Sequence, residues 1–212
     1  MLFYRCVWWI VAWGSGVLYR VRLRGRERLP ATGGYVLAPS HRSMMDIPFL
    51  ALVTKDRVRF MGKAEVFKVP VLGAAFAALG GFPVARDGTD RKAVRDSMEM
   101  LQHGEKLAVF PEGTRQNGDK IQPLQPGAAY LALRAGVPIV PVGIAGSEAI
   151  IRSRGRFFPR FDRVAIVIGE PVIPPPRTKS TVPRADVDAL TAQLAEVLQA
   201  TFDEAVALRN RS

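Results

Sequence analysis

Short apolar runs recur along this chain and are separated by longer segments of mixed polarity. Apolar runs of four to eight residues between turn residues are typical of buried strands, and strict alternation is typical of half-buried strands. We therefore expect strands near residues 19–24, 35–40, 58–62, 106–110, 138–146 and 163–171.

Helix signals lie between these strands. Some of the segments between the strands have a proline near their start and a glycine just past their end, and both residues are common at these positions of helices. Residues 184–208 repeat leucine, valine and phenylalanine at helical spacing, so they predict an amphipathic helix. Helices are expected at about 46–54, 90–102, 126–136 and 184–208. Strands that alternate with helices predict an α/β fold with a central mixed, mostly parallel sheet flanked by helices.

The composition fits one domain. The chain has 212 residues, of which 48% are hydrophobic, enough for a sizeable core. Cys6 is the only cysteine, so an internal disulfide is impossible, and one cysteine with two histidines cannot build a Cys/His zinc site. Motifs of P-loop NTPases, dinucleotide-binding proteins, zinc metalloproteases and nucleophile-elbow hydrolases are absent. We expect residues 20–212 to form this domain, with no cofactor and no metal.

The N-terminal segment combines apolar, aromatic and basic character. Its uncharged run, Cys6–Tyr19, is shorter than the roughly 20 residues that a spanning helix needs. All three tryptophans lie in this run, and five arginines follow between residues 20 and 28. Tryptophan favours the headgroup level of a bilayer, and arginine favours its anionic surface. Residues 1–19 therefore predict a membrane-interface helix; the alternative is a core helix followed by a strand with one basic face.

The charge balance indicates an anionic partner. The chain has 30 Lys and Arg residues against 19 Asp and Glu, a net charge of +11. Such a charge favours a phospholipid surface, a phosphorylated substrate or nucleic acid. We do not expect nucleic acid, because RNP-like and helix-turn-helix signatures are absent and the tryptophans lie in an aliphatic run.

Residues 69–85 form a second uncharged stretch, which is also too short to span a bilayer and is interrupted by proline and glycine. Its small residues suit close helix packing or one wall of a slot for an apolar chain. A buried core segment is the alternative, and the sequence leaves both open.

The stretch APSHRSMMDIPF, residues 38–49, places His41 five residues before Asp46. A histidine accepts and releases a proton near neutral pH, and it works best when a carboxylate fixes its tautomer. Positions five apart do not face each other on a helix, so the pair requires His41 in a turn and Asp46 in the first helical turn. The alternative is structural, because Ser43 and Asp46 have the spacing of a capping box.

A second polar loop, FPEGTR, ends the strand expected at 106–110. In α/β sheets, ligands bind at the carboxyl edge of the strands, where this loop would lie. Arg115 offers a planar fork of donors that suits a phosphate, and Gly113 allows close approach of the backbone. The loop therefore predicts an anion-binding segment beside His41 and Asp46.

Taken together, SHRSMMD and FPEGTR resemble the motifs of the glycerolipid acyltransferases, in particular the 1-acyl-sn-glycerol-3-phosphate acyltransferases of the PlsC type. The resemblance extends to KAEVFKVPVLG (63–73), GGFPVAR (80–86) and VPIVPVGI (137–144), and it covers roughly residues 20–170. One departure is Ser40, where family members usually carry asparagine.

The resemblance implies a base-assisted acyl transfer. His41, held by Asp46, would remove the proton of a glycerol hydroxyl, which would attack an acyl thioester carried on coenzyme A or on acyl carrier protein. The product would be phosphatidic acid, made for phospholipid synthesis by a peripheral or monotopic protein at the cytoplasmic face of the cell membrane. The implied substrate-binding residues are Lys63, Arg86, Glu112, Gly113, Thr114 and Arg115.

Other functions stay open at this point. The acceptor could also be glycerol-3-phosphate, another lysophospholipid or a glycolipid, because the motifs encode the chemistry better than the shape of the pocket. The acylated hydroxyl, sn-1 or sn-2, and the acyl length are equally open. A module of a different class, which binds anionic lipid without catalysis, also fits the charge, although lipid binding needs no base.

Overall fold

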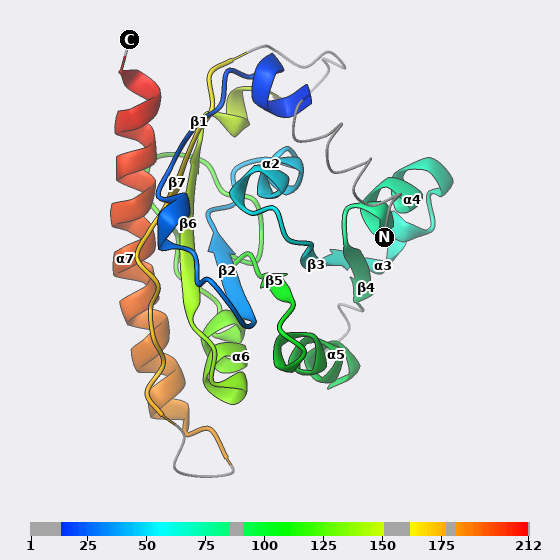
Figure 1. Ribbon diagram of the computed structural model, residues 1–212, viewed down its shortest axis with the longest axis vertical. Coiled ribbons are helices and arrows are strands. Elements are labelled where there is room, and N and C mark those ends of the chain that lie inside the picture. Colours follow the sequence, from blue (N-terminus) through cyan, green and yellow to red (C-terminus); the bar gives the residue numbers. More distant parts are fainter. Residues whose placement is uncertain (1–13, 85–90, 151–161, 177–180, 212) are drawn as a thin grey trace.

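The computed structural model describes residues 14–84, 91–150, 162–176 and 181–211. It has a central sheet with helices on both faces (Figure 1). The seven strands found among the described residues are β1 (Arg22–Arg24), β2 (Tyr35–Pro39), β3 (Val58–Lys63), β4 (Gly81–Val84), β5 (Lys106–Ala108), β6 (Ile139–Ala145) and β7 (Ala165–Ile168). Their order is β1-β7-β6-β2-β5-β3-β4. The β6–β7 pair is antiparallel and the other neighbours are parallel, which confirms the predicted α/β fold with a mixed, mostly parallel sheet.

Helices follow most strands. They are α2 (Asp46–Val53), α3 (Ala64–Phe67), α4 (Pro70–Ala78), α5 (Arg91–Gln102), α6 (Gly127–Ala135) and α7 (Arg184–Asn210), with short 3-10 helices η1 (Arg26–Arg28) and η2 (Ser147–Ala149). Within the described part of the chain, no helix combines the length and the apolar character needed to cross a bilayer. The membrane-interface helix predicted at residues 1–19 lies mostly outside the described residues, which begin at Gly14.

The two faces of the sheet are covered by different helices. Phe49 of α2 packs with Leu37 of β2 on one face. On the other face, Leu190 and Leu194 of α7 belong to a cluster with Val36 of β2, to which α5 and α6 also contribute. A strand that is buried on both faces has apolar residues at successive positions, which explains the unbroken apolar run of β2. The predicted amphipathic C-terminal helix is α7, which lies along β6 and β7 (Figure 1).

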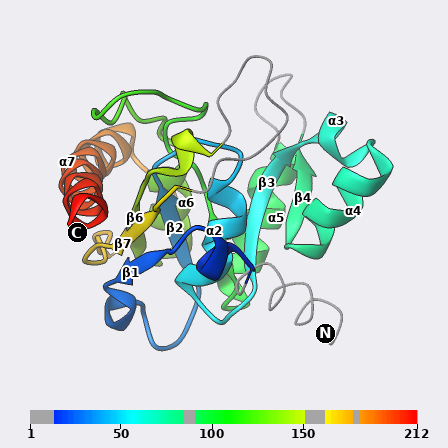
Figure 2. The same ribbon diagram turned by 90° about the horizontal axis from the view of Figure 1, so that it is seen from above.

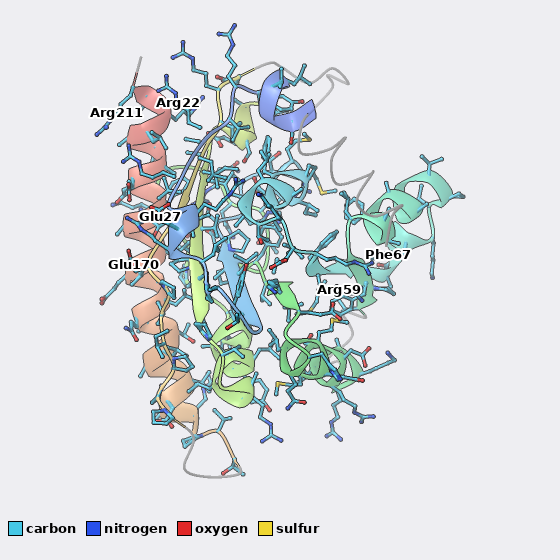
Figure 3. All side chains as sticks on the ribbon, in the orientation of Figure 1. Arg22, Glu27, Arg59, Phe67, Glu170 and Arg211 are labelled. Atoms are coloured by element: carbon cyan, nitrogen blue, oxygen red, sulfur yellow. The ribbon has the colours of Figure 1, made fainter. Side chains whose placement is uncertain are left out.

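The uncharged stretch at residues 69–85 is buried only in part, because Phe76 and Phe82 belong to core clusters whereas much of α4 is exposed. The α3–α4 pair lies at the opposite end of the sheet from α7 (Figure 2). Phe76 is buried against Phe67, which Figure 3 labels, whereas Val69 and Val71 are 49% and 85% exposed. Because α4 is apolar all round, its sequence has no periodic signal that separates a buried face from an exposed one.

The parallel strands bring the sequence motifs to one edge of the sheet. β2 leads into His41, and β5 leads into the FPEGTR loop. Lys63 ends β3 at the same edge, but its side chain lies outside the described structure, as does the whole of Arg86. Ligands bind at this carboxyl edge in α/β sheets, so the fold places the two described motifs where a site is expected.

Candidate active site

His41 and Asp46 flank the turn between β2 and α2. β2 ends at Pro39, and Asp46 is the first residue of α2. Nδ1 of His41 lies 2.9 Å from Oδ2 of Asp46. The same oxygen accepts the backbone N–H groups of Arg42 and Ser43, each at 2.7 Å. One carboxylate oxygen of Asp46 therefore makes both contacts considered from the sequence: it binds the imidazole of His41, and it caps the backbone of the turn that carries His41.

The contact with Asp46 decides which nitrogen of the imidazole is free. A carboxylate only accepts hydrogen bonds, so Nδ1 of His41 is the donor in this contact, and in the neutral form of the ring Nε2 keeps a lone pair. The Asp46 side chain is fully buried, while that of His41 is 14% exposed and lines a cavity. The ring also lies against Phe110, with the two ring centroids 4.0 Å apart. The imidazole is thus held by two neighbours and has one nitrogen available as a proton acceptor.

Glu112 of the FPEGTR loop is buried and binds the histidine turn. Its Oε1 accepts the backbone N–H of His41 at 2.9 Å, and its Oε2 accepts that of Gln122 at 3.1 Å. Nη1 of Arg42 lies 3.4 Å from Oε2. In return, the carbonyl of His41 accepts the backbone N–H of Gln116 at 2.8 Å. Of the two roles considered for Glu112, these contacts favour ordering of the loop over contact with an acceptor.

The next three loop residues, Gly113, Thr114 and Arg115, are exposed and line the same cavity as His41. Gly113 has a φ of 72°, a left-handed conformation that glycine adopts without strain. This turn takes the chain from the buried Glu112 to the exposed Arg115 within three residues. The loop can therefore order the histidine turn and present a cation to a ligand at the same time.

The cavity has a volume of about 1110 Å³ and walls of two kinds. Polar residues come from the histidine turn, the loop after β5 and η2; they include His41, Thr114, Arg115, Asn117 and Glu148. Apolar residues come from the histidine turn, α2, β3, α3, α4 and β4; they include Met44, Ile47, Met61, Val66, Phe76 and Val84. An apolar pocket with a few convergent polar groups is the usual form of a ligand site. Among the described residues, no group of three or more His, Cys, Asp or Glu side chains could hold a metal ion.

Ser40, the departure from the family motif, is fully buried beside the site. Its Oγ accepts the backbone N–H of Ile144 at 2.9 Å and donates to the carbonyl of Ile144 at 3.3 Å. The hydroxyl therefore joins the end of β2 to β6 one residue before His41.

Arg42 is part of the site, although its sequence position carries no signal of such a role. Its side chain is 1% exposed and lies 4.7 Å from the centroid of the Phe202 ring of α7. A buried carboxylate such as Glu112 requires a nearby cation or several donors, but the sequence does not indicate that Glu112 is buried. Asn117 and Glu148 are also missing from the sequence prediction, because neither belongs to one of the recognised motifs.

Comparisons with known proteins identify the family to which this sequence is similar. The sequence model of the acyltransferase family matches residues 20–145. A 1-acyl-sn-glycerol-3-phosphate acyltransferase of Bacillus subtilis is 29% identical over 153 residues, which cover 72% of this chain and 73% of the relative. A lyso-ornithine lipid O-acyltransferase of Pseudomonas aeruginosa is 30% identical over 140 residues, which cover 65% of this chain and 52% of the relative. The chain spans less than half the length of the plant chloroplast relatives that it also matches.

One solved structure shares the fold over the whole chain. The crystal structure of the 1-acyl-sn-glycerophosphate acyltransferase PlsC from Thermotoga maritima matches with a TM-score of 0.71 at 24% sequence identity. The match covers 100% of this chain and 97% of that chain.

Proposed function

The chain belongs to the acyltransferase family, and from this premise we propose that it transfers a fatty acyl group from an acyl thioester to the free hydroxyl of 1-acyl-glycerol-3-phosphate. The product is phosphatidic acid, which enters phospholipid synthesis. The observation that carries this proposal is the contact between His41 and Asp46 on the wall of a cavity that Arg115 also lines.

His41 acts as the base in the proposed reaction. Its Nε2 takes the proton of the acceptor hydroxyl while the hydroxyl oxygen attacks the carbonyl carbon of the thioester. The tetrahedral intermediate then collapses, the C–S bond breaks, and the sulfur leaves as a thiol with the proton that His41 returns. Asp46 keeps the ring oriented and stabilises the imidazolium between the two steps. A thiol leaves readily, so the reaction needs no covalent acyl-enzyme.

The loop after β5 is the proposed phosphate site. The guanidinium of Arg115 can bind two phosphate oxygens at once, and Gly113–Arg115 line the cavity beside His41. Lys63 and Arg86 are proposed as further ligands, because β3 and β4 both end at this edge of the sheet. Glu112 contributes by ordering this loop.

The apolar wall of the cavity is the proposed place of the acyl chain. Met61 of β3, Val66 of α3 and Phe76 of α4 line it. Each buried methylene contributes about 0.8 kcal/mol, so such a wall can hold a fatty chain while its thioester lies at His41.

The proposed place of action is an anionic membrane surface, because the acceptor and the product are lipids. The net charge of +11 favours such a surface. Val69 and Val71 expose apolar side chains on the helical pair whose Phe76 lines the cavity. The helix predicted at residues 1–19 would add to this contact. Donors carried on coenzyme A or acyl carrier protein place the reaction at the cytoplasmic face.

A second acceptor is supported by one observation. Glu148 lines the cavity with a side chain that is 41% exposed, and its carboxylate, whose Oε1 lies 3.9 Å from Nη1 of Arg209, suits the amine of an ornithine head group. The relative from Pseudomonas aeruginosa is named for that class of acceptor.

An acceptor panel tests these proposals. Purified protein in detergent is given radiolabelled acyl-coenzyme A and lysophosphatidate, glycerol-3-phosphate, lyso-ornithine lipid or monoacylglycerol. We expect lysophosphatidate to be acylated fastest, and we expect His41→Ala to abolish transfer while vesicle binding persists. Faster acylation of lyso-ornithine lipid would favour the second acceptor, and transfer to none of the four would favour a non-catalytic lipid-binding module. Positional analysis of the product separates acylation at sn-1 from acylation at sn-2.

A further inference from the structure

We propose that Arg42 is a positioning residue for the acyl transfer and that it sets the place of His41 through the carboxylate of Glu112. Arg42 directly follows His41 in the chain, and its backbone N–H is one of the donors to Asp46. The kinetic test of this inference rests on the proposed function. The structural test, which follows the backbone amide of His41, needs no substrate.

The side chain of Arg42 connects segments that are distant in the sequence. Its Nη1 lies 3.4 Å from Oε2 of Glu112, an ion-pair contact that does not meet hydrogen-bond geometry, and its Nη2 donates to the carbonyl of Lys120 at 3.1 Å. Its guanidinium lies 4.7 Å from the centroid of the Phe202 ring, which α7 contributes. A buried guanidinium is stable only with such partners, because it has lost its water. Arg42 therefore holds the histidine turn against the loop after β5 and against α7.

Glu112 connects Arg42 to the histidine. Its carboxylate is fully buried, accepts hydrogen bonds from the backbone N–H groups of His41 and Gln122, and forms an ion pair with Arg42. Without the guanidinium, a buried negative charge would remain with backbone donors alone. The carboxylate would then move toward water in the cavity, and the backbone of His41 would lose its partner.

The contact between Arg42 and Glu112 matters for the reaction because it joins the turn that carries the proposed base to the loop that carries the proposed phosphate ligand. His41 stands in one segment, and Arg115 follows Glu112 by three residues in the other. Their separation decides whether a phosphate-bound acceptor places its hydroxyl at Nε2 of His41. A displacement of about 1 Å can lower a rate on the order of 100-fold. Arg42 acts here through Glu112, since its own side chain is 1% exposed.

Arg59 offers a matched control. It lies on β3, as labelled in Figure 3, with Nε 3.5 Å from Oε2 of Glu105 and its guanidinium 5.9 Å from the centroid of the Phe82 ring. An arginine, a glutamate and a phenylalanine thus meet again near the amino end of a strand, away from the edge that carries His41.

The first measurement is structural. The chain has two histidines, so labelling with nitrogen-15 histidine yields two backbone amide signals. The His41 amide binds Glu112, and the His103 amide binds the carbonyl of Glu99 and serves as the internal reference. In Arg42→Gln we expect the His41 signal to shift and its hydrogen exchange to accelerate at least about tenfold, with His103 unchanged. Arg59→Gln should change neither signal. An unaltered His41 signal in folded Arg42→Gln would overturn the proposal.

The second measurement is kinetic. Arg42→Gln should lower kcat by about 10- to 100-fold and leave both KM values within about threefold, because alignment is lost and binding is not. Arg42→Lys keeps the charge without the fork of donors and should recover part of the loss. The double variant with Glu112→Gln should be no slower than the slower single variant, since both changes break one link. The proposal is contradicted if the kcat losses of Arg42→Gln and Glu112→Gln multiply in the double variant. It is also contradicted if Arg59→Gln lowers kcat as much as Arg42→Gln does.

If Arg42→Gln does not fold, a second variant takes its place. Phe202→Leu removes the ring beneath the guanidinium and leaves the ion pair with Glu112. A shift of the His41 signal smaller than that expected for Arg42→Gln would support the link, and no shift would refute it. If the unaltered protein acylates none of the acceptors, the proposed function fails, and the amide measurement alone decides on Arg42.

Discussion

The backbone N–H of His41 donates a 2.9 Å hydrogen bond to Oε1 of Glu112, although the two residues are 71 positions apart in the chain. A different carboxylate, that of Asp46, binds the ring of the same histidine. Backbone and ring of the proposed base are therefore held by separate residues, and changes to the two should have separable effects.

Replacement of Asp46 by asparagine should lower kcat by about 1,000-fold or more and change the KM for the acceptor by less than about threefold. The amide oxygen can keep the contacts that Oδ2 makes to the ring and to the backbone, but a neutral amide no longer stabilises the imidazolium that forms when His41 takes up the proton. Steady-state kinetics with acyl-coenzyme A and lysophosphatidate measure both constants. Asp188→Asn, on the exposed side of α7, is the control. A raised KM at constant kcat would assign Asp46 to binding instead.

Arg115→Ala should raise the KM for lysophosphatidate by about 10- to 100-fold, the effect of one lost charge-assisted contact. The KM for monoacylglycerol, which has no phosphate, should stay the same. Arg134→Ala on α6 controls for the loss of a positive charge elsewhere. An equal rise for both acceptors would remove the assigned role of Arg115 in phosphate binding.

Phe76→Leu should shift the donor preference toward longer acyl chains. The ring of Phe76 lines the apolar wall and packs edge-on against Phe60 and Phe67, so a smaller side chain extends the cavity in that direction. Competition between acyl-coenzyme A donors of different length measures the shift. Phe82→Leu, in the core cluster on the other face of the sheet, should lower stability without altering the preference. An unchanged preference in Phe76→Leu would place the acyl chain elsewhere.

Val71→Asp should weaken binding to anionic phospholipid vesicles by at least about tenfold, because a charge on the outer side of α4 opposes insertion. Transfer between water-soluble short-chain substrates should persist. Ile173 is 69% exposed and follows Val172, which pairs with Ile139. Ile139 begins β6, so this position lies at the amino end of the strand, away from the edge that carries His41. Ile173→Asp is therefore the matched control in a vesicle co-sedimentation assay. Equal losses for both variants would show that no particular face meets the lipid.

Much of the fold follows from local patterns. β2 is an unbroken apolar run that ends at Pro39, and α7 repeats apolar residues at helical spacing, so length and period identify both. The exposure of Val71 could not be predicted, because a helix with apolar residues all round carries no directional signal. Which helices cover which face also depends on contacts between distant segments, such as Leu194 of α7 with the cluster around Val36.

The candidate site also has a part that the sequence predicts and a part that it does not. His41, Asp46 and the FPEGTR loop are recognisable because their spacing and order are specific, and the strand–turn–helix arrangement explains why residues five apart can meet. Arg42 is different, since nothing in its local sequence indicates that its side chain is buried against Glu112 and Phe202. Its role depends on Phe202 of α7, which is 160 residues further along the chain.

The base and the carboxylate that orients it belong to one strand–turn–helix unit, β2 to α2, whereas most of the cavity wall comes from other strands, helices and loops. Proton transfer and substrate selection are thus encoded largely in separate stretches of the gene. Mutations in the walls can change the accepted head group or fatty chain while the proton-transferring unit stays intact, a division that would let one ancestral scaffold diversify across the lysolipids of different membranes.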